Sequence, residues 1–208
     1  MDNAMRHWMG VMGLVVGAGA LTVGAQPAGD VTGVYKKEGG TLAILQGDNE
    51  TLVHYQRSFP QGESAGTCEC TLVVKSKTAT RWTLAGPDLA PGKLSLDVAP
   101  GRFVLAGANP GCCGAGWPGR DEFSRAQAAT PPASCKVRAP RVYFQATDEG
   151  NTQRKAYVVQ GDTVEAFIPP TEPDLVPARF KAKKTTAGLL QRTQLECTSA
   201  PAATPRSR

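Results

Sequence analysis

Six cysteines restrict the folds open to this chain more than any other feature, because each disulfide would hold two distant segments side by side. They occur as a Cys-x-Cys pair, a vicinal pair and two single residues, namely Cys68, Cys70, Cys112, Cys113, Cys135 and Cys197. Thiols in an oxidising compartment indicate disulfides, whereas thiolate binding of a soft metal is the alternative. Vicinal cysteines rarely bond to each other, and the two cysteines of an extended Cys-x-Cys segment point to one face. We therefore expect the Cys-x-Cys pair to bond to the vicinal pair, which leaves Cys135 for Cys197.

The N-terminal residues have the order of an export signal. Arg6 and His7 form a short basic start, an apolar stretch covers 11–23, and Gly24 and Ala25 place small residues where a signal peptidase cleaves. The apolar stretch is shorter than the roughly 20 residues that span a bilayer. We predict a signal peptide at 1–25, with an uncleaved anchor as the alternative. The mature protein is then periplasmic or secreted, and no stable membrane insertion is expected after cleavage.

The mature sequence is typical of an all-β protein. It is rich in proline, with 16 in the whole chain, shows no long amphipathic helix pattern, and contains many short runs of Val, Thr, Tyr and Phe. Strands are expected at 31–35, 41–46, 51–55, 70–75, 80–85, 93–98, 103–106, 142–145, 156–160, 163–168, 175–181 and 188–195. Segments 60–66 and 107–120 are rich in turn-forming residues and are expected to be loops.

A change in composition divides the chain. Residues 126–135 have the Ala, Pro and Ser content of a linker. The sequence thus predicts a disulfide-stapled β domain at 26–125, a linker at 126–135, a small β-barrel at 136–198 and a disordered tail at 199–208.

Several motifs follow one another in the C-terminal part. They are Val142-Tyr143-Phe144, Lys155-Ala156-Tyr157-Val158-Val159, Gly161-Asp162-Thr163-Val164, Val176-Pro177-Ala178-Arg179-Phe180 and Thr186-Ala187-Gly188-Leu189-Leu190. In this order they resemble bacterial Src-homology-3-like domains of exported envelope proteins. The resemblance implies a small Src-homology-3-like barrel. Leu189 stands where the family usually has Trp, an aromatic that often lines the family's ligand groove.

A second pattern lies in the N-terminal part. Cys70, Trp82 and the segment Cys113-Gly114-Ala115-Gly116-Trp117 are followed by Phe123. This pattern is similar to small cysteine-containing periplasmic proteins of the lysozyme-inhibitor type. It implies an alternative function as a periplasmic inhibitor or immunity protein against a peptidoglycan-degrading enzyme.

Positive charge is concentrated in the C-terminal part. Residues 26–135 hold ten Lys and Arg against ten Asp and Glu, whereas 136–208 hold twelve against seven. A basic region favours an anionic partner, here peptidoglycan or an acidic envelope protein. In an extended strand Arg179, Lys181 and Lys183 share one face and form a cationic ridge, unless they protect an exposed sheet edge. Nucleic acid is not expected, because aromatic residues do not interleave the basic ones.

The mature sequence shows no pattern of a catalytic site. His54, its single histidine, alternates outward in a strand and is expected to be exposed rather than to act as a base. Asp121 and Glu122 are expected in a solvated loop rather than as a glycosidase pair. A nucleophile elbow, a zinc-binding histidine pair and a phosphate loop are all missing. We therefore expect a non-enzymatic binding protein of the cell envelope without metal or cofactor.

The two tryptophans of the mature N-terminal part receive different expectations. Trp82, in a strand, is expected in the core, whereas Trp117, in the glycine-rich loop, is a candidate exposed anchor. The complete set of candidate binding residues is Trp117, Arg120, Tyr157, Arg179, Lys181 and Lys183.

Overall fold

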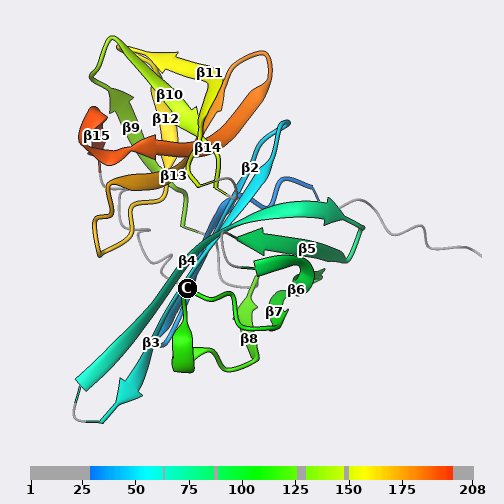
Figure 1. Cartoon of the computed structure of the whole chain (residues 1–208). Helices are drawn as coiled ribbons and strands as arrows, with labels where there is room; N and C mark the ends of the chain where they lie inside the picture. Colours follow the sequence, from blue (N-terminus) through cyan, green and yellow to red (C-terminus); the bar gives the residue numbers. More distant parts are fainter. Residues whose placement is uncertain (1–28, 63, 87–88, 126–129, 148–149, 199–208) are drawn as a thin grey trace, which may run out of the picture.

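The structure is a computed structural model that describes residues 29–62, 64–86, 89–125, 130–147 and 150–198 (Figure 1). The predicted signal peptide and the predicted C-terminal tail lie outside these residues. Within the described ranges, no helix has the length and apolar content required to cross a membrane. The all-β prediction is confirmed, because the described elements are strands and two short 3-10 helices.

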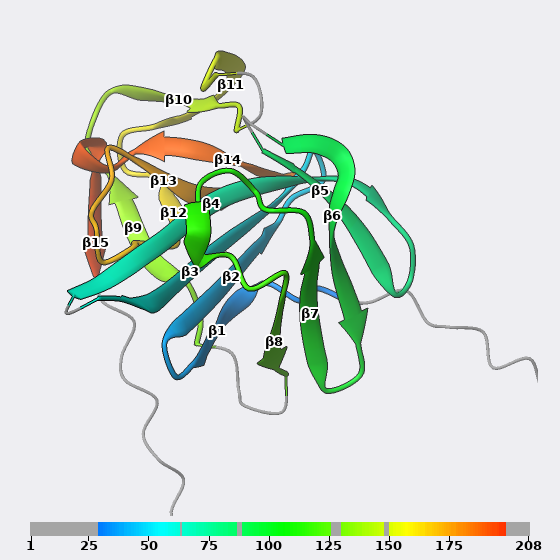
Figure 2. The same ribbon diagram turned by 60° about the horizontal axis from the view of Figure 1, so that its bottom comes forward.

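The first unit is an antiparallel meander of eight strands. They are β1 (Gly33–Lys37), β2 (Gly40–Gln46), β3 (Thr51–Gln61), β4 (Ser64–Lys77), β5 (Arg81–Gly86), β6 (Leu89–Ala99), β7 (Arg102–Gly107) and β8 (Arg120–Ser124). Each strand pairs with the next in sequence, and the sheet curls until β8 approaches β1, as Figure 2 shows. The result is a nearly closed barrel. An ion pair between Lys37 of β1 and Asp121 of β8 links the two end strands.

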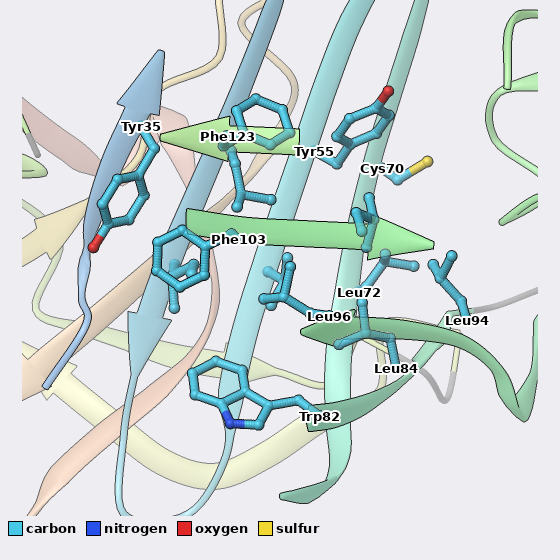
Figure 3. Close-up of a cluster of buried hydrophobic side chains, with 14 of the residues drawn as sticks. Tyr35, Tyr55, Cys70, Leu72, Trp82, Leu84, Leu94, Leu96, Phe103 and Phe123 are labelled. Atoms are coloured by element: carbon cyan, nitrogen blue, oxygen red, sulfur yellow. The ribbon is translucent and has the colours of Figure 1, made fainter. Parts of the chain in front are cut away.

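Alternating side chains fill the interior of this barrel. On β3, Val53 and Tyr55 point inward and pack with Leu72 of β4 and Phe103 of β7. Figure 3 shows Tyr55, Leu72 and Phe103 in this cluster, together with Trp82, which is confirmed as a core residue. Apolar side chains thus occupy the space inside the wall, and burial of their surface is the main stabilising term.

The second unit is a seven-stranded antiparallel sheet. Its strands are β9 (Ala133–Val137), β10 (Arg141–Gln145), β11 (Gln153–Val159), β12 (Thr163–Ala166), β13 (Leu175–Lys181), β14 (Thr185–Gln191) and β15 (Leu195–Thr198). The strand order is β11-β10-β14-β13-β12-β9-β15, with a 3-10 helix, Arg192–Gln194, before the last strand. Phe144, Val164 and Leu190 belong to the hydrophobic core of this unit. β9 begins at Ala133, inside the segment predicted as a linker.

The second unit packs on the outer wall of the barrel. Leu189 of β14 contacts a cluster of Leu52, Val73 and Ala85 that points outward from β3, β4 and β5. Asn49 closes the junction with two hydrogen bonds, because its amide donates to the Ala187 carbonyl at 2.9 Å and its side-chain oxygen accepts from the Ala187 amide at 2.8 Å. Part of the wall is therefore buried on both faces.

The cysteines lie at bonding distance in the predicted arrangement. Cys68 faces Cys113, Cys70 faces Cys112 and Cys135 faces Cys197, with Cα–Cα distances of 4.3, 5.7 and 3.9 Å. The first two bridges tie β4 to the segment after β7. The third joins β9 to β15, which are also paired by register.

The prediction of a loop at 60–66 is wrong. β3 continues to Gln61 and β4 starts at Ser64, and these two residues pair directly. Gly66 lies within β4. A side chain has no room at this position, because a Cβ would lie only 2.5 Å from the ring of Phe59. A glycine that signals a turn in the sequence is thus required here by close packing between two strands.

Candidate functional site

The structure distributes the candidate binding residues over both units rather than gathering them into one site. Trp117 and Arg120 belong to the barrel, and the other four belong to the second sheet. Their environments differ in burial and in the partners that each side chain contacts, so each is described separately.

Trp117 is half-buried and packs against the end of the barrel core. It follows the 3-10 helix Gly114–Gly116, and its indole Nε1 donates to the Gly107 carbonyl at 3.0 Å. The ring stands edge-on to Tyr55 with centroids 5.7 Å apart. The expected exposed anchor is therefore a partly covered residue that closes one end of the barrel.

Arg120 lies on the outer wall of β5–β8, beside a shallow hollow of about 450 Å³. Arg81 and Asp97 line the same hollow and form an ion pair of 2.6 Å. Arg120 itself lies 3.8 Å from Glu122. The arginines of this wall thus have acidic neighbours, and the wall has little surplus charge to attract an anion.

The prediction that Asp121 lies in a solvated loop is wrong. It belongs to β8 and is buried, where it accepts a hydrogen bond from the Tyr55 hydroxyl at 2.8 Å and pairs with Arg57 at 3.0 Å and with Lys37. Burial alone would raise the pKa of Asp121, but the hydrogen bonds from Lys37 and Tyr55 outweigh it and lower the pKa. This carboxylate holds β1, β3 and β8 together and is not open to a substrate.

The prediction that His54 is an exposed strand residue is also wrong. Its side chain points outward from the barrel, as the alternation requires, but the second unit covers it and leaves 2% exposed. Its ring lies 4.8 Å from the ring of Phe167, and its Nδ1 is 2.9 Å from the Thr71 hydroxyl. Burial lowers the pKa of His54 to about 3, so the ring is neutral near pH 7, and the 3.9 Å approach of Glu69 is not an ion pair there.

The prediction of an exposed cationic ridge formed by Arg179, Lys181 and Lys183 is wrong, because Arg179 is buried. It is 5% exposed and lies in the junction between the units, where it pairs with Glu165 at 2.5 Å and with Asp30 at 3.1 Å. Lys181 shares Glu165 at 2.8 Å, whereas Lys183 is exposed in the turn after β13. Edge protection is excluded as well, because β13 is paired on both sides, by β12 and β14.

Tyr157 is the candidate residue that the structure presents to solvent as part of a cluster. It pairs in register with Tyr143 across β10 and β11, with ring centroids 5.6 Å apart. The guanidinium of Arg141 lies 4.4 Å from the centre of the Tyr157 ring, and Val159 continues the same face. We call Arg141, Tyr143, Tyr157 and Val159 the aromatic ladder.

The aromatic ladder is the most exposed apolar surface among the described residues. Tyr157 is 45% exposed and Val159 40%, and no other large hydrophobic side chain in the described ranges is as exposed. Sequence reasoning found Tyr157 but missed Arg141, Tyr143 and Val159. The signal was present, since alternate residues of two paired strands share one face.

A further hollow of about 270 Å³ lies where the two units meet. Its lining comes from β4, from the segment after β7 and from the second unit, and comprises Glu69, Cys70, Thr71, Leu72, Pro110, Cys112, Thr147, Asn151, Leu175 and Leu189. The hydroxyl of Thr147 is buried without a hydrogen-bond partner in the part of the chain that the structure describes.

The sulfur atoms are the groups best suited to hold a metal ion. The Sγ atoms of Cys68, Cys70 and Cys113 lie within 4.8 Å of one another, and all three residues are buried. In the disulfide form they have no free thiolate to offer.

Comparison with known proteins adds no relative: no protein-family model, curated protein or solved structure matches the chain.

Proposed function

We propose that this chain is an exported, non-enzymatic binding protein of the cell envelope and that the aromatic ladder binds peptidoglycan. The observation that carries the proposal is the exposure of this ladder on the paired strands β10 and β11, whereas Asp121, His54 and Arg179 are buried. A protein partner with an acidic surface is the alternative occupant.

The chemistry of the ladder supports a ligand that has both apolar faces and negative charge. Tyrosine offers a broad face at a small entropic cost, because few torsions are fixed on binding. Arg141 adds a cation over the Tyr157 ring, and residues 136–208 carry an excess of positive charge. Peptidoglycan combines sugar rings with carboxylates of its stem peptides and so presents both features.

We also propose that the second unit is a Src-homology-3-like barrel. The motifs of the resemblance form β10 to β14 in the expected order, and β15 returns to pair with β9, the first strand of the unit.

The environment of the acid and base residues supports a non-enzymatic role. A general base must reach the proton that it removes, yet His54 is sealed between the units and Asp121 is engaged by two cations and a tyrosine. Neither side chain is placed to act on a substrate in solution.

Sedimentation with purified peptidoglycan tests the proposed binding. We expect the protein to sediment with the polymer at low salt and Tyr157→Ala to lower the affinity about tenfold, the loss that corresponds to ~1.4 kcal/mol. Arg141→Gln should also weaken binding and reduce its dependence on salt.

Lys183→Ala is the matched control, because Lys183 is an exposed cation of the same unit outside the ladder. If Lys183→Ala weakens sedimentation as much as Arg141→Gln, and Tyr157→Ala has no effect, general charge attraction explains the binding and the ladder does not. Absence of the unaltered protein from the pellet at low salt would reject peptidoglycan as the ligand.

A further inference from the structure

Four of the six cysteines converge at one end of the barrel. Cys68 and Cys70 come from β4, and Cys112 and Cys113 from the segment after β7. Two sulfurs that belong to different bridges, those of Cys70 and Cys113, lie only 3.5 Å apart. Cys112 is exposed to solvent, so a reductant can reach this group from outside, while the other three sulfurs lie inside.

The backbone around these cysteines is held by more than the bridges. Residues 68 and 70 lie within the long pairing of β3 with β4. The segment that carries the vicinal pair is held by the bond from the Trp117 indole to Gly107 and by a bond of 2.8 Å from the Ala108 amide to the Lys93 carbonyl. Reduction of the bridges therefore leaves the four thiols gathered in one place.

The local charge favours thiolates. Arg57 faces Cys68 across the paired strands, so their side chains share the inner face of the barrel. Arg57 and Lys37 together place two cations against the single carboxylate of Asp121. Neighbouring cations stabilise a thiolate relative to a thiol.

We propose that the reduced protein binds one soft metal ion, Cu(I), through Cys68, Cys70 and Cys113. Thiolates select Cu(I) over harder ions, and three sulfurs within 4.8 Å of one another suit its low coordination number. A dithiol reductant supplies two electrons and two protons to each bridge and itself becomes a disulfide. Each coordinating thiol then releases its proton to solvent as its S–Cu bond forms, and the copper stays Cu(I).

An anaerobic competition titration tests this site. The protein is reduced with a phosphine, freed of reductant and titrated with Cu(I) in the presence of bicinchoninate, whose coloured copper complex reports the free ion. We expect the reduced protein to withdraw one equivalent of Cu(I) from the chelator and the oxidised protein to withdraw none. Near-ultraviolet circular dichroism of the copper-loaded form should show ordered aromatic side chains.

Two variants separate this site from general thiol binding. Cys68→Ser with Cys70→Ser should abolish the uptake, whereas Cys135→Ser with Cys197→Ser should retain the full equivalent, because those cysteines lie in the second unit. The proposal is wrong if the reduced protein takes up no copper, if both double variants behave alike, or if the reduced chain in urea competes as well as the reduced chain in buffer.

Discussion

Acidification should destabilise this protein through His54. The pKa of His54 is about 3 in the folded protein, because burial disfavours the cation, against 6.5 for an unperturbed histidine. The unfolded state therefore binds more protons between these two values. Above pH 6.5 His54 is neutral in both states and does not change the unfolding free energy. As the pH falls from 6.5 toward 3, only the unfolded state binds the proton, so the unfolding free energy decreases progressively.

The size of the effect follows from the two pKa values. At pH 5 the folded ring is still neutral while the unfolded ring is almost fully protonated, which costs about 2 kcal/mol of unfolding free energy relative to pH 8. Below pH 3 the same gap amounts to about 5 kcal/mol. The carboxylates whose pKa values are lowered, such as Asp121 and Glu165, lose their contributions only below about pH 4.5. The window from pH 8 to 5 thus isolates His54.

Urea unfolding followed by tryptophan fluorescence measures this effect. The unaltered protein should lose about 2 kcal/mol more than His54→Gln between pH 8 and pH 5, because glutamine does not titrate. His54→Gln keeps a polar group near the Thr71 hydroxyl, so the pH dependence, rather than the stability at one pH, is the readout. Equal losses in the two proteins would show that the buried histidine does not resist protonation.

Three further predictions concern stability. Asp121→Ala should cost roughly 2–4 kcal/mol in urea unfolding, because it leaves partly buried cations and a hydroxyl without their acceptor, whereas Glu122→Ala, with longer contacts at an exposed position, should cost under about 0.5 kcal/mol. Cys135→Ser with Cys197→Ser should cost about 4 kcal/mol for a loop of 62 residues, measured as the shift in unfolding free energy. Leu189→Trp should cost about 1–3 kcal/mol by overpacking the junction. A neutral result in any of these three measurements would contradict the contact on which that prediction rests.

The strand class and the cysteine pairing could be read from the sequence because both depend on local spacing. Alternation predicts which residues of a strand share a face, so His54 lies on the face opposite Val53 and Tyr55, together with Leu52. It does not predict that a second unit covers this face. The run from Thr51 to Tyr55 is buried at every position, and such a continuous run is the pattern of a strand covered on both faces.

Arg179 was misjudged for a related reason. A charged residue in a strand is usually solvated, and its burial requires partners that lie far away in sequence. Asp30 and Thr32 supply two of these from the other unit, 149 and 147 residues away. No local sequence pattern predicts such a partner. Asp121 is the same case within the barrel, since its partners come from β1 and β3.

The junction also bears on where a ligand can bind. Leu189 occupies the position at which the resemblance expects a groove aromatic, and it is buried against Leu52, Val73 and Ala85. Leu189 also lines the hollow of about 270 Å³ at the junction, whereas the aromatic ladder lies on the exposed face of β10 and β11. The proposed binding and the packing of the two units therefore depend on different residues. Leu189→Ala should lower the unfolding free energy by roughly 2–5 kcal/mol and leave sedimentation with peptidoglycan unchanged. Tyr157→Ala should weaken sedimentation and leave the unfolding free energy nearly unchanged. If Leu189→Ala instead abolished sedimentation while the protein remained folded, the ligand would lie at the junction and not on the ladder.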